Sequence, residues 1–320
     1  MRVSKGLLGD AAHVTFQWDG RPMPAFQGDT VASALLAQGI RLMGRSFKYH
    51  RPRGPLSAGP EEPNALISAD GVPNTRATVQ EAYEGLDARS QNAWPSLAFD
   101  ALAVNDALSP FLGAGFYYKT FMWPTRFWES LYEPLIRRAA GLGRLPRTYD
   151  GEPFEKAWAF CDLLVIGGGP AGLMAALTAA RAGAEVILAD EGSRLGGRLL
   201  AEAEAVDGAP AHLWAGAAAA ELAGLPNVRV LTRTTVTGAY DGGTYGALER
   251  VGLHRPAGGD LPRECFWRIV AKRAVLASGA IERPMLFPGN DRPGVMLAGA
   301  VRAYLHRWGV AAGQRVVVYG

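Results

Sequence analysis

The chain has 320 residues, a length that predicts two or three domains, and 48% of them are hydrophobic, enough to bury a large core. Its 33 lysines and arginines against 30 acids give a formal net charge of +3, an excess too small to indicate a nucleic acid as partner. No apolar run reaches the roughly 18 residues that a membrane span needs, and residues 1–5 do not begin a secretory signal. These features predict a soluble, cytoplasmic protein.

The cysteines and histidines argue against a metal site. Cys161 and Cys265 are the only cysteines, and the five histidines are scattered along the chain. An iron–sulfur cluster needs about four ligands, and no histidines have the spacing of a zinc site. A disulfide is also disfavoured in a reducing cytosol. We therefore predict no metal site built by this chain alone.

Residues 1–94 have the pattern of a small α+β domain. Strands and one helix alternate in an order that favours a β-grasp, ferredoxin-like fold without cluster cysteines. Asp-Gly pairs mark hairpins, and a polar cap with a terminal glycine marks a helix. The elements expected are a hairpin over 12–26 turning at Asp19-Gly20, a helix from Asp29 or Thr30 to Gln38 stopped by Gly39, and strands at 64–69 and 77–79.

A basic stretch lies within this first domain. Its charged residues are interleaved with aromatic ones, which is one pattern of a nucleic-acid patch. The alternative is a rigid loop, given its prolines, that docks on an acidic partner or cofactor. The nearly neutral chain favours the loop. The basic residues are Arg41, Arg45, Lys48, Arg51 and Arg53.

Residues 95–158 form an aromatic-rich connector. So many aromatic side chains need a covering surface, which is either another domain of this chain or a neighbouring subunit. The sequence leaves these two alternatives open. The aromatic residues are Phe111, Phe116, Tyr117, Tyr118, Phe121, Trp123, Phe127, Trp128 and Tyr132.

Residues 159–320 predict a Rossmann-like, FAD/NAD(P)-binding domain. A strand at 163–166, a helix at 171–182 and a strand at 186–189 are followed by a helix at 212–222 and a strand at 228–231, an order typical of one mononucleotide-binding half. An antiparallel meander over 234–271 and a parallel strand at 273–278 follow. Residues 314–320 read as a fresh strand, so the polypeptide looks cut short at the start of a second dinucleotide-binding unit.

The glycine-rich turn Gly167–Gly172 carries the chemistry. It matches G-x-G-x-x-G between a strand and a helix, the context that confirms a dinucleotide site. Gly167 permits the tight turn, Gly169 lets the backbone approach a pyrophosphate, and Gly172 lets helix and strand touch. Free N–H groups and the helix dipole would stabilise the diphosphate. Asp190, at the end of the second strand, would accept hydrogen bonds from the adenine ribose and disfavour a 2′-phosphate.

The motif alone leaves NAD and FAD open. Pro170 and the later Gly196-Gly197 pair are typical of flavoproteins, and Ala277–Ala280 resembles an element of flavoproteins with two dinucleotide domains. No group has the pattern of a catalytic acid, base or nucleophile, so the catalytic residues are not assigned.

Several segments together resemble the N-terminal part of the α subunit of heterotetrameric sarcosine oxidase. Their order along the chain is far more specific than the glycine motif. The segments are Ser46–Gly54, Glu62–Leu66, Ser90–Ser96, Phe116–Lys119, Met122–Pro124, Gly167–Gly172, Ser278–Pro284 and Gly294–Met296.

This resemblance implies an oxidoreductase of composition αβγδ. Such an enzyme oxidatively demethylates sarcosine to glycine, makes hydrogen peroxide, and releases formaldehyde or transfers the carbon to tetrahydrofolate. The β subunit carries FAD and covalent FMN, whereas the α subunit binds NAD and, through a C-terminal domain absent from this sequence, the folate. The chain alone is therefore expected to be inactive. The family pattern would place NAD contacts on Ala171, Asp190, Glu191, Arg198 and Val236.

Two rival hypotheses remain beside this one. Opine oxidases, hydroxyproline dehydrogenases and cyanide synthase subunits are relatives that use FAD here, and many carry cysteines for a [2Fe–2S] cluster. The absence of cysteine from residues 1–160 favours the sarcosine oxidase branch. The first rival is thus a subunit of an FAD-dependent amine or amino-acid dehydrogenase. The second is a non-catalytic scaffold that holds a structural nucleotide.

Overall fold

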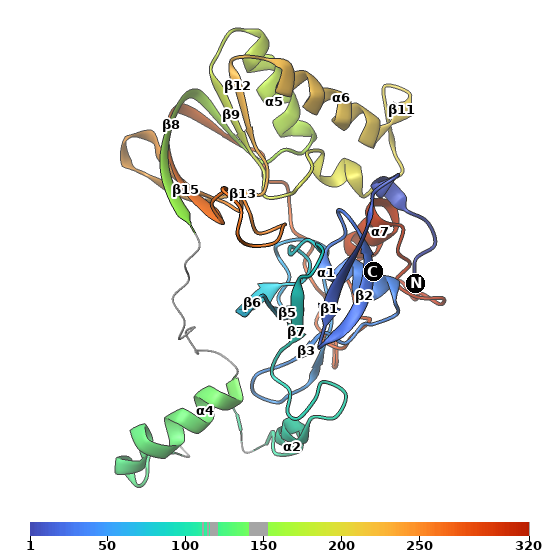
Figure 1. Cartoon of the computed structure of the whole chain (residues 1–320), viewed down its shortest axis with the longest axis vertical. Helices are drawn as coiled ribbons and strands as arrows, with labels where there is room; N and C mark the ends of the chain where they lie inside the picture. Colours follow the sequence, from blue (N-terminus) through green and yellow to red (C-terminus); the bar gives the residue numbers. More distant parts are fainter. Residues whose placement is uncertain (111, 114, 116–120, 141–152, 320) are drawn as a thin grey trace.

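The computed structural model describes residues 1–110, 112–113, 115, 121–140 and 153–319. The N-terminal residues build a five-stranded sheet and the residues from 154 onward build a six-stranded one, each accompanied by a two-stranded sheet (Figure 1). Helix α4 (Glu133–Ala140) lies apart from both sheets, beyond a short helix α2 (Val104–Ala107). No helix in the described ranges is long and apolar enough to cross a membrane.

The first sheet has the β-grasp arrangement expected. Its strand order is β2-β1-β7-β5-β6, with β1 parallel to β7 and the other pairs antiparallel. The hairpin turns at Asp19-Gly20, both with positive φ (49° and 76°), the backbone that the right-handed strand twist favours. The bounds are β1 His13–Trp18, β2 Arg21–Phe26, β5 Leu66–Ala69, β6 Val72–Arg76 and β7 Asp87–Ser90. The strand expected at 77–79 is replaced by β6.

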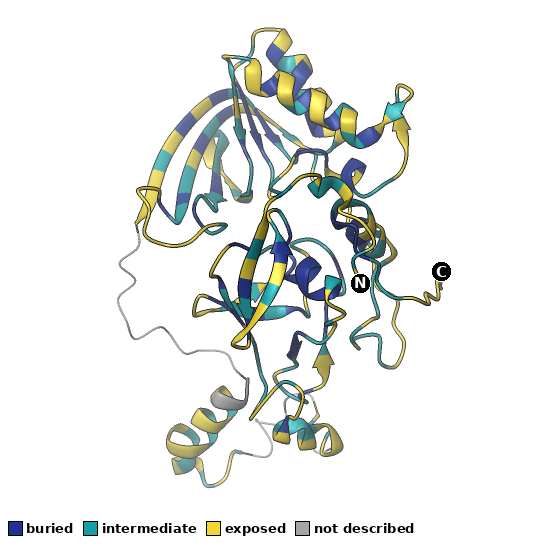
Figure 2. Cartoon of the chain, turned by 45° about the vertical axis from the view of Figure 1, so that its right-hand side comes forward, coloured by how far each residue is buried: buried dark blue, intermediate teal, exposed yellow. Residues whose placement is uncertain are grey.

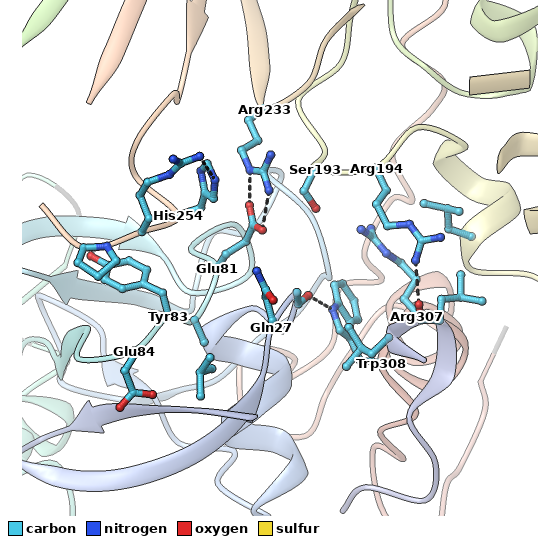
Figure 3. Close-up of a pocket in the computed structure, with 18 residues that line it drawn as sticks. Gln27, Glu81, Tyr83, Glu84, Ser193, Arg194, Arg233, His254, Arg307 and Trp308 are labelled. Carbon is cyan, nitrogen blue, oxygen red and sulfur yellow. Dashed lines mark hydrogen bonds and ion pairs between the residues drawn. The ribbon is translucent and has the colours of Figure 1, made fainter. Parts of the chain in front are cut away.

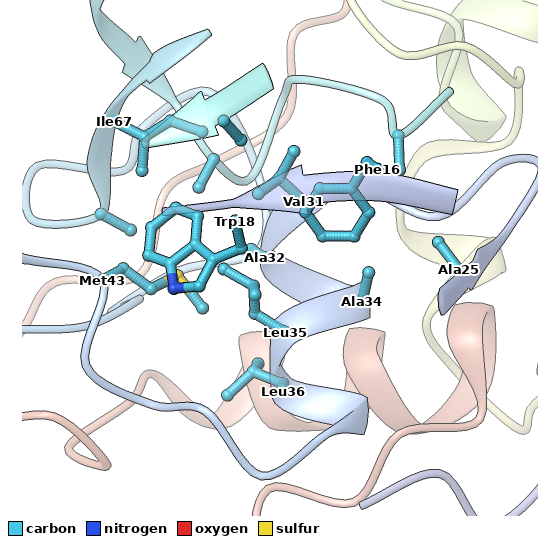
Figure 4. Close-up of a cluster of buried hydrophobic side chains, with 14 of the residues drawn as sticks. Phe16, Trp18, Ala25, Val31, Ala32, Ala34, Leu35, Leu36, Met43 and Ile67 are labelled. Carbon is cyan, nitrogen blue, oxygen red and sulfur yellow. The ribbon is translucent and has the colours of Figure 1, made fainter. Parts of the chain in front are cut away.

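Helix α1 (Val31–Ala37) packs its apolar face on this sheet. Thr30 is its N-cap: the Thr30 and Ser33 side chains each bond the other's backbone N–H, in a capping box. Leu35 is fully buried against Phe16 and Trp18 (Figure 4). This hydrophobic core positions the loop that follows the helix, which includes the two-residue strands β3 (Gly44–Arg45) and β4 (Pro52–Arg53).

The second sheet combines a parallel and an antiparallel half. Its order is β12-β9-β8-β15-β14-β13, with four parallel strands followed by two antiparallel ones. The predicted β-α-β-α-β unit and the meander are both present, and with the β-grasp sheet they confirm the expected fold class. The bounds are β8 Phe154–Ile166, α5 Pro170–Arg181, β9 Val186–Ala189, α6 Ala211–Gly224, β12 Val228–Leu231, β13 Thr234–Tyr240, β14 Thr244–Glu249 and β15 Glu264–Leu276.

Two strands differ from the expectation. The meander's last strand and the parallel strand expected at 273–278 are one continuous strand, β15, and β8 pairs with it from Phe154 onward instead of starting near Leu163. The strand expected at 314–320 is wrong for the described residues 314–319, where the side chains of Val317 and Val318 are 93% and 82% exposed. Within the described chain no neighbouring strand pairs with that segment.

Helix α7 (Ala298–Trp308) joins the two parts of the chain. Although it follows the dinucleotide-binding sheet in sequence, Tyr304 and Trp308 are buried in the N-terminal core. The Tyr304 hydroxyl donates to the Ser57 carbonyl at 3.0 Å, and Trp308 Nε1 donates to the Gly28 carbonyl at 2.9 Å. The domain boundaries expected at 94, 158 and 159 stay predictions, but α7 shows that the last segment helps to build the first domain.

The described connector has two parts, of which the first contacts the N-terminal domain through Leu97, Asp100 and Asp106, whereas residues 121–137 are mostly exposed. Trp123 is 82% exposed, and its neighbours in the segment of α4 are mostly exposed as well (Figure 2). Phe111, Phe116, Tyr117 and Tyr118 lie outside the described residues. The exposed position of Trp123 is consistent with an interface between subunits, which stays a prediction.

Candidate dinucleotide-binding site

The glycine turn connects β8 to α5 and has almost no room for side chains. Gly167 has φ +106°, and a Cβ there would lie 2.4 Å from the Ala277 carbonyl oxygen. A Cβ on Gly172 would lie only 1.8 Å from the Gly167 carbonyl oxygen. Both positions therefore require glycine, for the turn and for the contact between helix and strand, as the sequence predicts.

Gly169 is different, because a Cβ there would meet no atom within 4 Å. Its backbone is extended (φ −73°), so its conformation does not require glycine either. Gly169 is the N-cap of α5, Pro170 occupies the first turn, and that turn holds no acidic residue. The first N–H groups of a helix lack intrahelical partners and carry the positive end of its dipole. The space beside Gly169 thus suits a diphosphate that approaches the backbone closely.

Asp190 has a different immediate role from the one expected. Its Oδ2 accepts from the Gly168 N–H at 2.6 Å, and its Oδ1 accepts from the Gly192 N–H at 2.7 Å. The carboxylate therefore holds the glycine turn against the loop that follows β9. Each oxygen keeps a second acceptor position, so a contact to the ribose stays a prediction.

This arrangement predicts that Asp190→Asn lowers stability. The asparagine amide has one oxygen, which can accept from only one of the two backbone N–H groups, and its NH₂ would face the other N–H group. We therefore expect a loss of about 1–3 kcal/mol in the free energy of unfolding. Urea denaturation measures it, with the exposed Asp241 changed to Asn as control. Equal stability of wild type and Asp190→Asn would show that the two hydrogen bonds do not hold the turn.

Glu191 follows Asp190 in the loop after β9. Desolvation, and then the charge of Asp190, raise the pKa of the Glu191 carboxyl. The Arg250 guanidinium donates to the Glu191 carbonyl at 2.7 Å and fixes the backbone of this loop. The Glu191 side chain is thus the second acid at the strand end that could meet a ribose.

The structure brings further predicted segments to the turn. The Gly196 N–H donates to the Gly168 carbonyl at 2.8 Å. A Cβ on Gly197 would lie 3.0 Å from the Gly169 Cα. The Ala277 N–H donates to the Ile166 carbonyl at 2.8 Å, which places the Ala277–Ala280 element beside the first glycine.

Two of the expected cofactor contacts lie farther along these segments. Arg198 is exposed and forms an ion pair with Glu202, which also pairs with Arg302 at 2.9 Å. Val236 lies on β13, two residues beyond Thr234, whose N–H donates to the Asp190 carbonyl at 2.8 Å. Ala171, at the start of α5, is exposed. Contact of these residues with a cofactor stays a prediction.

The basic stretch is largely neutralised by acids of the same chain. Arg51 pairs with Asp106 at 2.7 Å, and Arg53 pairs with Asp291. Arg45 lies 3.6 Å from the Asp100 carboxylate, which also bonds the buried His50 at 2.7 Å. These contacts fix the loop and leave less unpaired positive charge for a nucleic acid. Docking of the loop on an acidic partner or cofactor stays a prediction.

Two family models match the chain. A model described as pyridine nucleotide-disulphide oxidoreductase matches residues 161–320, which is half of the sequence. A model described as 2Fe-2S iron-sulfur cluster binding domain matches residues 11–93. The chain therefore belongs to the pyridine nucleotide-disulphide oxidoreductase family, and its second domain is of the dinucleotide-binding kind.

The particular relatives agree with the resemblance seen in the sequence. Over 98% of its length the chain is 60% identical to the sarcosine oxidase alpha chain of Rhizobium meliloti (strain 1021), and it spans 32% of that protein. It is 41% identical over 94% of its length to the protein of the same name from Corynebacterium sp. (strain P-1), of which it spans 27%. The chain is thus similar to the N-terminal portion of sarcosine oxidase α subunits and spans about a third of their length.

More distant proteins match as well. An opine oxidase subunit of Agrobacterium tumefaciens (strain Ach5) is 37% identical, but over only 50% of this chain and 32% of its own length. Among solved structures, L-proline dehydrogenase from P. horikoshii matches with a TM-score of 0.62 at 22% identity, covering 98% of this chain and 50% of that one. This last similarity shows the fold alone.

The residues of the first domain do not fit a [2Fe–2S] cluster. Residues 1–160 contain no cysteine, and no described group of three or more His, Cys, Asp or Glu could hold a metal ion. The loop between α1 and β5 is organised by Glu62 instead. The Glu62 side chain is buried, and its carboxylate accepts five hydrogen bonds. The donors are the backbone N–H groups of Leu56, Ser57, Asn64 and Ala65, at 2.7–3.0 Å, and the Ser57 hydroxyl at 3.0 Å.

Glu62 is a residue whose role the sequence did not reveal. It lies within a segment that carries the family resemblance, but nothing in the spacing of its neighbours identifies it as an acceptor. A buried carboxylate is stable only when donors surround it. The one feature of the sequence that points to this role is the position of an acid within a loop rich in glycine and proline.

Proposed function

We propose that this chain is the NAD-binding portion of a sarcosine oxidase α subunit. One observation carries the cofactor part: Gly167 and Gly172 have no room for a Cβ, whereas Gly169 faces open space. A turn that only served folding would need glycine at the first and last positions but not at the middle one. The remaining glycine is accounted for by the close approach of a diphosphate.

In this proposal the residues of the turn bind and orient the dinucleotide. The first N–H groups of α5 donate to the diphosphate, Asp190 holds the turn in shape, and Asp190 or Glu191 accepts from the ribose. Arg198 and Val236 would contact the remainder of the adenosine half. When bound, NAD supplies a group that can accept or donate a hydride; the described residues hold it in place.

The reaction of the whole enzyme is a further part of the proposal. Sarcosine would be oxidatively demethylated to glycine with release of hydrogen peroxide and formaldehyde or methylene-tetrahydrofolate. The flavins would lie on a separate β subunit, with γ and δ completing the assembly, and tetrahydrofolate would bind outside these 320 residues. The support is the 60% identity to a sarcosine oxidase α subunit over nearly the whole chain. In addition, the sequence shows no pattern of a catalytic acid, base or nucleophile beside the glycine turn.

An FAD-dependent opine or hydroxyproline dehydrogenase subunit is the second candidate. Pro170 and Gly196-Gly197 favour a flavin, and the similarity to an opine oxidase subunit is real. That similarity covers only half of the chain, whereas the sarcosine oxidase relatives match over 94% or more. The similarity therefore favours the first candidate. A scaffold that holds a structural nucleotide is compatible with either.

An absorbance spectrum with a turnover assay separates these candidates. We expect a purified chain without a flavin band, which releases NAD on denaturation and does not oxidise sarcosine. Co-expression of the full-length α subunit with β, γ and δ should restore sarcosine oxidation. Stoichiometric FAD released from the chain would favour the dehydrogenase candidate. Sarcosine turnover by the chain alone would contradict the multisubunit proposal.

A further inference from the structure

A cavity of about 560 Å³ lies between the two domains and is lined in part by Ser193 and Arg194 of the loop that follows β9 (Figure 3). The N-terminal domain contributes Glu81 and Tyr83, the dinucleotide domain contributes Arg194 and Arg233, and α7 contributes Arg307. Volumes of this size are typical of sites for small organic molecules. The glycine turn is not among its lining residues, so the cavity is distinct from the turn.

The lining carries more positive than negative charge. Four arginines face two glutamates, and both glutamates are already engaged. Glu81 holds Arg233 through two contacts at 2.5 and 2.9 Å, which also joins the two domains. Glu84 accepts from the Thr15 N–H at 2.7 Å. Within the described residues no acid of the lining forms an ion pair with the remaining arginines of the cavity.

Among the arginines that line the cavity, Arg194 and Arg307 lie next to each other (Figure 3). The Arg194 guanidinium donates to the Leu7 carbonyl at 2.8 Å, and the Arg307 guanidinium lies over the Trp308 ring at 4.5 Å. Neither forms an ion pair with an acid of the described chain. Burial, and then the adjacent Arg194, lower the pKa of Arg307 to about 10. The charges of Asp190 and Glu81 act on that pKa in the opposite direction with smaller effect. Two neighbouring guanidinium groups that form no ion pair with a described acid are an arrangement that binds phosphate or carboxylate oxygens.

His254 also lines the cavity, as a neutral ring. Arg255 lies 3.1 Å from its Nε2, and because an arginine only donates, Nε2 accepts and the ring proton is on Nδ1. That Nδ1 is buried and has no hydrogen-bond partner among the described residues. Burial, and then Arg233, lower the pKa of His254, which keeps the ring neutral near pH 7.

We propose that this interdomain cavity binds an organic anion, with its phosphate or carboxylate between Arg194 and Arg307. Its apolar part would pack against Leu8, Val14 and Tyr83, which also line the cavity. Such a ligand would contact both domains and α7 at once, so its binding would stabilise their association. Ligands with a phosphate and ligands with a carboxylate would both have a negatively charged oxygen group attached to a small apolar group.

Thermal unfolding of the purified chain tests this site with three probes at constant ionic strength. Phenyl phosphate and benzoate, which carry the two kinds of oxyanion, are compared with phenol, which has the ring without the charge. We expect one or both anions to raise Tm and phenol to leave it unchanged; the stronger anion identifies the headgroup. Saturation with NAD beforehand should not remove the effect, because the cavity is distinct from the glycine turn.

Substitutions locate the effect in the cavity. Arg194→Gln and Arg307→Gln should each raise the Kd for the stronger anion about tenfold, the loss of one charge-assisted hydrogen bond. Without anion, Arg307→Gln should keep or raise Tm, because a like charge is removed. The matched control is Arg229→Gln: Arg229 also lies over a tryptophan, Trp267, at 5.2 Å, but does not line the cavity. Its Kd should be unchanged.

Three results would overturn the proposal: no shift of Tm with either anion, an unchanged Kd in both cavity variants, or competition between the anion and NAD. If Arg307→Gln does not fold, Arg194→Gln decides, because the exposed Arg194 contributes little to the core. The Tm shifts and the Kd changes in the variants do not depend on which dinucleotide the glycine turn binds, so their failure is distinguishable from failure of the proposed function.

Discussion

Glu62→Ala is expected to lower the free energy of unfolding by about 3–5 kcal/mol, the range for removing one partner from a buried charged network. Four backbone N–H groups and one hydroxyl converge on this carboxylate. Alanine would leave all five donors without this acceptor in a buried loop. The loop carries Ser57, whose carbonyl binds Tyr304 of α7, so the contact between the domains should weaken with it.

Chemical denaturation monitored by circular dichroism measures this loss. Glu62→Gln should fall between the alanine variant and wild type, because its single oxygen replaces part of the acceptor set while its NH₂ faces donors. Glu61→Ala is the matched control, since Glu61 is the adjacent acid and is exposed; its effect should stay within about 0.5 kcal/mol. If Glu62→Ala proves as mild as Glu61→Ala, the carboxylate does not organise the loop.

The first domain matches a cluster-binding family over residues 11–93, although residues 1–160 contain no cysteine. Its loop between α1 and β5 is held by the Glu62 carboxylate, which accepts four backbone N–H groups and one hydroxyl. The first domain then serves as a structural partner for α7 and for the dinucleotide domain, joined to them by Tyr304, Trp308 and the Arg233–Glu81 pair.

The sequence predicted those elements that depend only on neighbouring residues in the chain. The Asp19-Gly20 hairpin, the Thr30 cap and the glycine turn each depend on a few consecutive residues, and the structure has all three. The strand at 314–319 failed for a related reason: an apolar run indicates a strand only where a partner strand pairs with it. Its sequence alone could not supply that information.

Contacts between distant segments could not be predicted in the same way. The spacing of Asp190 predicts a ribose contact, which stays a prediction, but it does not predict the hydrogen bonds of its carboxylate to Gly168 and Gly192. The burial of α7 in the N-terminal core joins residues more than 200 positions apart, as the Tyr304–Ser57 hydrogen bond shows. The proximity of Arg194 to Arg307 arises from the same packing. No periodicity encodes such contacts, because they depend on how two folded domains meet.

Gly169→Ala and Gly172→Ala are expected to separate binding from folding. A Cβ on Gly169 meets no atom within 4 Å and its φ is −73°, so this variant should fold with wild-type stability. The same methyl group would occupy the space that a diphosphate needs at the backbone. Loss of about 3 kcal/mol from phosphate hydrogen bonds corresponds to a Kd for NAD that is roughly 100-fold higher.

Gly172→Ala should do the reverse, because its Cβ would lie 1.8 Å from the Gly167 carbonyl oxygen and the backbone itself must shift. We expect a loss of about 3 kcal/mol in unfolding free energy, at the upper end for overpacking, with binding lost as a consequence. Equilibrium dialysis with NAD and with FAD, beside urea denaturation of each variant, measures both effects. A Gly169→Ala chain that is stable and still binds either dinucleotide at full affinity would show that the diphosphate does not lie at this turn.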